Sequence, residues 1–242
     1  MKKFALIFAA GLWAMPALAG TQTAWLGLPS AQPADTLMPD RSGFSGDLAG
    51  ATERDYAAIL MSAFRSAFAR DVRARVIIIA PLNGDEYSIA VKQRGGRFRI
   101  VAEQSTQSLW RYTASGRAQA AQLKQRLEPA SYRDVPIERC SVSVDAKLGN
   151  DLVAVWHAML TQADNRSWYD APAEDAQLYF SSAVGNRVLA GRTSTSFQGE
   201  KVDTLIRIAD SLNQYCLHKS RRFVTDLRTE VGSLMPTLKT EK

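Results

Sequence analysis

The clearest pattern along the chain is a series of three short apolar segments separated by turn-forming residues. These segments span residues 76–80, 87–91 and 98–102. The first is mostly β-branched, the other two alternate apolar with polar residues, and Asn83-Gly84 and Gly95-Gly96 stand between them. Such alternation, interrupted by these dipeptides, is typical of antiparallel strands joined by tight turns. We therefore predict a three-stranded meander.

A second pattern, in which apolar residues recur every three or four positions, predicts helices. It covers residues 56–68, 152–160, 202–216 and 223–231, and the first helix is expected to end near residues 70–73. Residues 140–146 alternate like a half-buried strand, and residues 178–195 are typical of a hairpin. Segment 107–127 leaves two alternatives, a strand that extends the sheet or a helix.

The order of these elements predicts an α+β fold. A three-stranded meander is followed by strand, helix, hairpin and helix, which favours antiparallel sheets with helices packed on one face. We expect residues 51–242 to form a single domain. Pro129 and Pro136 bracket a linker at 129–138, which either divides that domain into two lobes or joins halves of one sheet.

The N-terminus has the pattern of a secretory signal peptide. Lys2 and Lys3 precede an apolar run at 4–15, and Ala17-Leu18-Ala19 supplies the small residues that a signal peptidase requires. We predict a signal peptide at 1–19, cleaved after Ala19, and a bacterial periplasmic protein; an uncleaved anchor is the alternative. Residues 20–50, rich in Pro, Gly, Ala and Ser, are expected to form an extended lead segment.

The charge balance is mildly basic. The chain has 30 Lys and Arg against 24 Asp and Glu, a net charge of +6, and loss of Lys2 and Lys3 with the leader lowers it to +4. This excess is too small to indicate nucleic-acid binding. No stretch after the leader approaches the ~20 apolar residues of a transmembrane helix, so we expect none in the mature chain.

The two cysteines, Cys140 and Cys216, have a specific interpretation in an oxidising compartment. Cys140 shares the apolar side of a predicted strand with Val142 and Val144, and Cys216 lies on the apolar side of a predicted helix. We predict a disulfide between strand and helix, worth about 4 kcal/mol in the chain-entropy model. Two separate buried thiols are the alternative.

The residues required by common catalytic machineries are scarce. The chain has only two histidines, His157 and His218, far apart in the sequence, and no metal-ligand spacing is present. Neither Gly-x-Ser-x-Gly nor Ser-x-x-Lys occurs. We therefore predict no catalytic residue, no metal and no cofactor, and a non-enzymatic protein.

Paired carboxylates supply the alternative, a cell-envelope hydrolase that acts on peptidoglycan. The candidates all lie in the second half of the chain: Asp145, Asp151, Asp164, Asp170, Glu174 and Asp175. Sequence alone does not bring any two of them together.

Two features predict a binding surface. The 92–99 hairpin gathers positive charge around one turn, with Arg94, Arg97 and Arg99 as candidates, although charge that protects a sheet edge is an alternative explanation. Trp168 and Tyr169 are residue types favoured at interfaces, although aromatic residues that close a core from the side are an alternative explanation. We expect an exported, periplasmic, non-enzymatic binding protein whose partner is another envelope protein. Its sharpest form is immunity- or inhibitor-type protection against an envelope-targeting enzyme.

Overall fold

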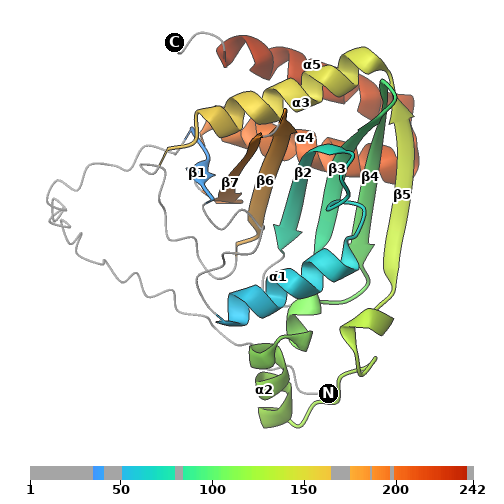
Figure 1. The fold of residues 1–242 in the computed structure, drawn as a ribbon, viewed down its shortest axis with the longest axis vertical. Coiled ribbons are helices and arrows are strands. Elements are labelled where there is room, and N and C mark those ends of the chain that lie inside the picture. The colour runs from blue at the N-terminus through green and yellow to red at the C-terminus, as the bar shows by residue number, and fades with distance from the viewer. Residues whose placement is uncertain are drawn as a thin grey trace, which may run out of the picture. The chain divides into compact units, whose positions relative to one another are not determined.

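The structure is a computed structural model that describes residues 35–40, 51–79, 84–164, 175–185, 187–196 and 199–238. The predicted leader and nearly all of the predicted lead segment lie outside these residues. Within the described residues, seven strands form one antiparallel sheet in the order β1-β7-β6-β2-β3-β4-β5 (Figure 1). The strands are β1 Met38–Pro39, β2 Val72–Ile79, β3 Tyr87–Arg94, β4 Arg97–Ser105, β5 Ile137–Val144, β6 Gln177–Val184 and β7 Arg187–Ser194.

Five α-helices and two short 3₁₀ helices complete the described part of the chain. They are α1 Ala51–Ala63, η1 Leu109–Tyr112, α2 Ala114–Gln122, η2 Tyr132–Asp134, α3 Ala146–Thr161, α4 Glu200–His218 and α5 Arg221–Thr237. The predicted α+β class is confirmed, as are the meander β2–β3–β4 and the hairpin β6–β7. The predicted linker at 129–138 ends earlier than expected, because residues 137 and 138 already belong to β5, which pairs with β4 along eight residue pairs of the same sheet.

The central strands carry apolar side chains on both faces of the sheet. On one face, Val76 of β2 and Ile89 of β3 pack in a core formed with α3, α4 and α5. On the other, Ile77 and Ala90 pack with Leu60 of α1. The expectation of helices on one face therefore holds for α3, α4 and α5, whereas α1 covers the opposite face. The reason is the run 76–79, which is apolar at odd and even positions alike and requires cover on both sides.

Three further predicted segments differ from the structure in extent. The strand predicted at 140–146 spans Ile137–Val144, because Asp145 caps α3 and Ala146 begins it. The first helix ends at Ala63, and residues 64–71 form turns and bends, although Phe64 and Ala67 remain fully buried. The apolar residues therefore keep their helical spacing beyond the residue at which the helix ends. In the ambiguous segment 107–127, the chain forms η1 and then α2, not a further strand.

A buried carboxylate ties several of these elements together. Glu86, just before β3, is 1% exposed, and its Oε1 accepts a hydrogen bond of 2.6 Å from the hydroxyl of Tyr56 on α1. The other donors to its carboxylate are the hydroxyls of Ser105 and Ser108 at 3.1 and 3.2 Å and the backbone N–H groups of Leu109 and Trp110 at 2.8 and 3.0 Å. Burial, and then the charge of Glu86, raise the pKa of the Tyr56 hydroxyl. Glu86 thus links α1, the end of β4 and η1 to the start of β3.

The cysteine pair connects the sheet to the helical layer. Cys140 of β5 and Cys216 of α4 lie at disulfide distance, with an S–S separation of 2.04 Å and a Cα–Cα separation of 5.7 Å. Cys216 is fully buried, and Cys140 packs against the same core. The predicted strand-to-helix pairing is confirmed.

Candidate functional site

The candidate site begins at the turn between β3 and β4. This turn is Gly95-Gly96, with φ of +56° and +75°, the left-handed region in which glycine is unstrained and which a two-residue hairpin of this kind requires. It places Arg94 directly opposite Arg97 in the ladder. Two cations are therefore held side by side at the end of a regular hairpin.

The same face of the sheet continues onto β5. Lys92 lies opposite Arg99, and Arg99 lies opposite Ser143 of β5. Side chains two residues apart share a face, so the Arg99 side of β4 also carries Glu103, whose partner in the ladder is Arg139. Three neighbouring strands thus direct their basic and hydroxyl side chains to one side of the sheet.

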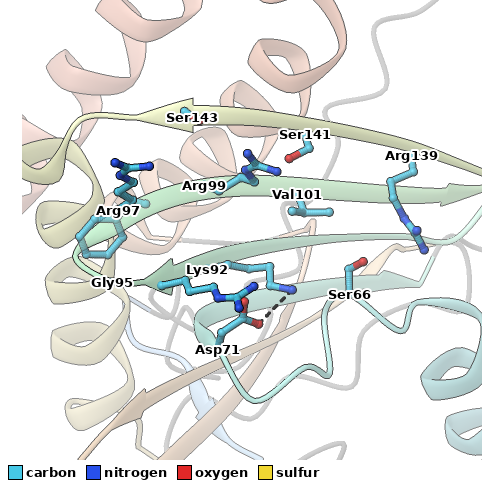
Figure 2. A pocket seen from close by; sticks show the side chains of 12 residues that line it. Ser66, Asp71, Lys92, Gly95, Arg97, Arg99, Val101, Arg139, Ser141 and Ser143 are labelled. Atoms are coloured by element: carbon cyan, nitrogen blue, oxygen red, sulfur yellow. Dashed lines mark ion pairs between the residues drawn. The ribbon is translucent and has the colours of Figure 1, made fainter.

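These side chains line an open groove of about 800 Å³, which we call the basic groove (Figure 2). Its basic residues are Lys92, Arg94, Arg97, Arg99 and Arg139. One wall comes from the 64–71 segment, which contributes Ser66 and Asp71. The backbone N–H of Ser66 donates to Glu103 Oε2 at 3.0 Å, so a carboxylate of the sheet holds this wall in place.

Only part of the positive charge in the basic groove is compensated. Lys92 Nζ lies 2.9 Å from Asp71 Oδ1, and Arg139 donates to the buried Glu103, with an Nε–Oε1 distance of 2.8 Å. Arg94, Arg97 and Arg99 are exposed, and no acidic partner for any of them lies among the described residues. The groove therefore presents three uncompensated guanidinium groups.

The position of these arginines also bears on the alternative of a charge-protected edge. Strands β3 and β4 are interior strands, flanked by β2 and β5. Protection of an edge therefore does not account for Arg94, Arg97 and Arg99. Arg99 projects from a strand that is paired on both sides, and Arg94 and Arg97 pair with each other directly beyond those ladders, an arrangement suited to a preorganised binding surface.

The structure describes four of the six candidate carboxylates of the hydrolase alternative and gives side-chain contacts for three of them. Asp145 caps α3 by accepting from the backbone N–H of Leu148 at 3.0 Å; this hydrogen bond and the charge of Arg228 lower the pKa of the carboxyl group. Asp151 pairs with Lys147 one turn away at 2.6 Å. The hydroxyl of Ser196 donates to Asp175 at 2.6 Å, and Asp164 follows the end of α3. Asp170 and Glu174 lie outside the described residues.

The remaining candidates from the sequence fall elsewhere. Trp168 and Tyr169 lie outside the described residues. His157 is on α3, and His218, at the end of α4, stacks on Phe223 with ring centroids 5.9 Å apart. In the described part of the chain, no group of three or more His, Cys, Asp or Glu is arranged to hold a metal ion, and no helix is long and apolar enough to cross a membrane.

The structure adds residues that sequence reasoning missed. Arg139, Ser141, Ser143 and Glu103 belong to the groove or support it, but they become neighbours only through the β4–β5 pairing. The alternation of apolar and polar residues around Cys140 predicts a strand whose polar residues lie on the face opposite the cysteine. What the pattern lacks is any indication of which strand lies next to it.

No protein-family model matches the chain, and no curated protein matches its sequence.

Proposed function

We propose that this protein is an exported, periplasmic, non-enzymatic binding protein that holds an acidic surface of another envelope protein in its basic groove. The observation that carries the proposal is the set of three exposed arginines, Arg94, Arg97 and Arg99, which line an open groove on the interior β3–β4 hairpin and have no acidic partner among the described residues.

The chemistry of the groove suits binding of carboxylates. A guanidinium group stays protonated at any physiological pH and therefore does not exchange protons as an acid–base catalyst does. Its planar set of N–H donors matches a carboxylate in a two-point contact. The hydroxyls of Ser66, Ser141 and Ser143 line the same groove and can donate further hydrogen bonds.

Two features support export. The first is the leader pattern at 1–19. The second is the cysteine pair at disulfide distance, which is compatible with an oxidising compartment.

An inhibitor or immunity role is the sharpest form of the proposal. Enzymes that cleave glycosidic bonds of the cell envelope commonly carry paired carboxylates in their active-site cleft. A rigid surface with three free arginines is complementary to such a cleft. Binding of the acidic surface around such a cleft in the basic groove would block substrate entry without any chemistry in this chain.

The test compares two variants that lose the same charge. The groove variant is Arg94→Gln/Arg97→Gln/Arg99→Gln, and the control variant is Arg126→Gln/Arg187→Gln/Arg221→Gln, at exposed positions on other elements. Wild type and both variants are immobilised, exposed to periplasmic extract, and their bound proteins are quantified by mass spectrometry. We expect an acidic protein that wild type and control variant retain and that the groove variant loses at least tenfold. Equal retention by all three chains would overturn the proposal.

A further inference from the structure

Strand β5 forms one edge of the sheet and has an unused pairing side. Its eight residues pair with β4 on one side, and no described strand pairs with the other (Figure 1). Alternate residues of a strand direct their N–H and C=O groups to the same side, so half of β5 presents donors and acceptors outward. The opposite edge of the sheet, β1, is only two residues long.

Devices that normally block strand addition are few on β5. Proline, bulges, short length and added charge are the common ones. Pro136 precedes the strand instead of interrupting it, and the pairing with β4 runs without a register shift. The charged residues, Glu138 and Arg139, stand near one end, and residues 140–144 are uncharged. This edge is therefore open to another strand.

The two faces of β5 specify what an added strand must carry. On one face, Arg139 and Ser143 belong to the basic groove, with Arg99 on the neighbouring strand. On the other, Val142 and Val144 pack against the core formed with the helices. A strand laid beside β5 continues both faces, so its side chains alternate between a basic and an apolar environment.

The last turn of α4, next to the disulfide, carries an exposed apolar residue. Leu217 directly follows Cys216, the residue bonded to Cys140 of β5, and is 45% exposed. An exposed leucine on the helix that the disulfide joins to β5 favours a partner that also carries apolar residues.

We propose that an extended segment of the partner protein, in which acidic and apolar residues alternate, pairs with β5 as an eighth strand. Its acidic side chains reach the basic groove, and its apolar side chains continue the Val142–Val144 face. The inference rests on the proposed function, because the acidic residues need the free arginines as their counterions. Backbone pairing supplies affinity, and the alternation of side chains supplies specificity.

The charge of the basic groove favours an acidic partner segment over a second copy of the chain as the strand that pairs with β5. Pairing β5 with β5 of another copy would place a second Arg139 on the adjacent strand and the Arg97 and Arg99 of that copy one strand beyond it. Like charges at such positions are destabilising. An acidic segment removes this repulsion and compensates the free guanidinium groups.

The test measures fluorescence anisotropy of three labelled eight-residue peptides with the oxidised protein. One peptide alternates Glu and Val; the second has the same composition in two blocks; the third is the alternating peptide with N-methyl groups on its central amides. We expect the alternating peptide to bind at least tenfold more tightly than either of the others. We also expect the groove variant to weaken this binding at least tenfold, and the control variant to change it less than threefold.

Each other outcome is decisive. Equal binding of the three peptides, lost in the groove variant, would mean that charge alone holds acidic chains, which overturns strand addition and leaves the proposed function standing. Peptide binding that the groove variant does not weaken would contradict the proposed function itself. No binding of any peptide at millimolar concentration, or a stable dimer of the chain in sedimentation, would also overturn the pairing of β5 with a partner segment.

Discussion

Replacement of Glu86 by glutamine tests how the face of the sheet that carries α1 is held together. The carboxylate accepts five hydrogen bonds through two oxygens, three on Oε1 and two on Oε2. Glutamine has the same shape but only one acceptor oxygen, and its NH₂ group must face one of the two sets of donors. In either orientation, the NH₂ group of the glutamine faces a backbone N–H donor of η1, that of Leu109 or that of Trp110.

The magnitude follows from these contacts. A buried donor left without an acceptor costs about 1–3 kcal/mol, and the bonds that remain are weaker because their acceptor is neutral. Relief of the cost of burying a charge offsets part of this loss. We expect Glu86→Gln to lower the free energy of unfolding by about 3 kcal/mol.

Urea denaturation at neutral pH, followed by circular dichroism, measures this change. With an m-value of about 2 kcal/mol/M, the midpoint should fall by about 1.5 M. The control is Glu138→Gln at an exposed position of β5, which should change stability by less than about 0.5 kcal/mol. If Glu86→Gln is as stable as the control, the carboxylate does not hold these elements together.

Three further predictions concern stability. The disulfide closes a loop with a sequence separation of 76, and its reduction should lower the free energy of unfolding by about 4 kcal/mol. Urea titrations with and without reductant measure this change. A loss below about 1 kcal/mol would contradict the chain-entropy estimate. Gly149→Ala places a Cβ 2.1 Å from the ring of Phe98 and should destabilise by about 1–3 kcal/mol. Gly232→Ala, where a Cβ has no neighbour within 4 Å, should stabilise by up to about 1 kcal/mol; equal melting temperatures of the two variants would refute the packing argument. The lowered pKa of Asp145 means that its contribution to stability is present above the unfolded-state value, near 3.8, and is lost as the pH falls through the folded-state value. Asp145→Asn, which retains a cap, should therefore reduce the loss of stability between pH 5 and pH 2, and an unchanged loss would count against this assignment.

The fold was predictable where the pattern is local. The period-two alternation at 87–102 and the Gly95-Gly96 turn specify a hairpin, and α4 and α5 follow from the three-and-four spacing of their apolar residues. The end of α1 was not predictable in this way, because Phe64 and Ala67 stay buried after the helix stops and so continue the helical spacing. Burial, not helix formation, determines that pattern.

The candidate site was only half accessible from the sequence. Arg94, Arg97 and Arg99 lie within one hairpin, so their proximity follows from a local turn. Their proximity to Arg139 depends on pairing between two strands that are separated by more than thirty residues. The alternation of apolar and polar residues does not specify which strands pair. Glu86 was missed for a related reason, because its donors come from α1, β4 and η1 and a lone glutamate before a strand resembles any exposed one.

The most direct test of the central claim is the affinity of the captured partner for wild type, groove variant and control variant, measured by calorimetry at low and physiological salt. Each arginine–carboxylate contact is worth about 1 kcal/mol, so loss of three should weaken binding about a hundredfold. We predict this loss for the groove variant, a change below threefold for the control variant, and weaker wild-type binding at the higher salt concentration. Equal affinity of the three chains, or binding of wild type that salt does not affect, would contradict that claim.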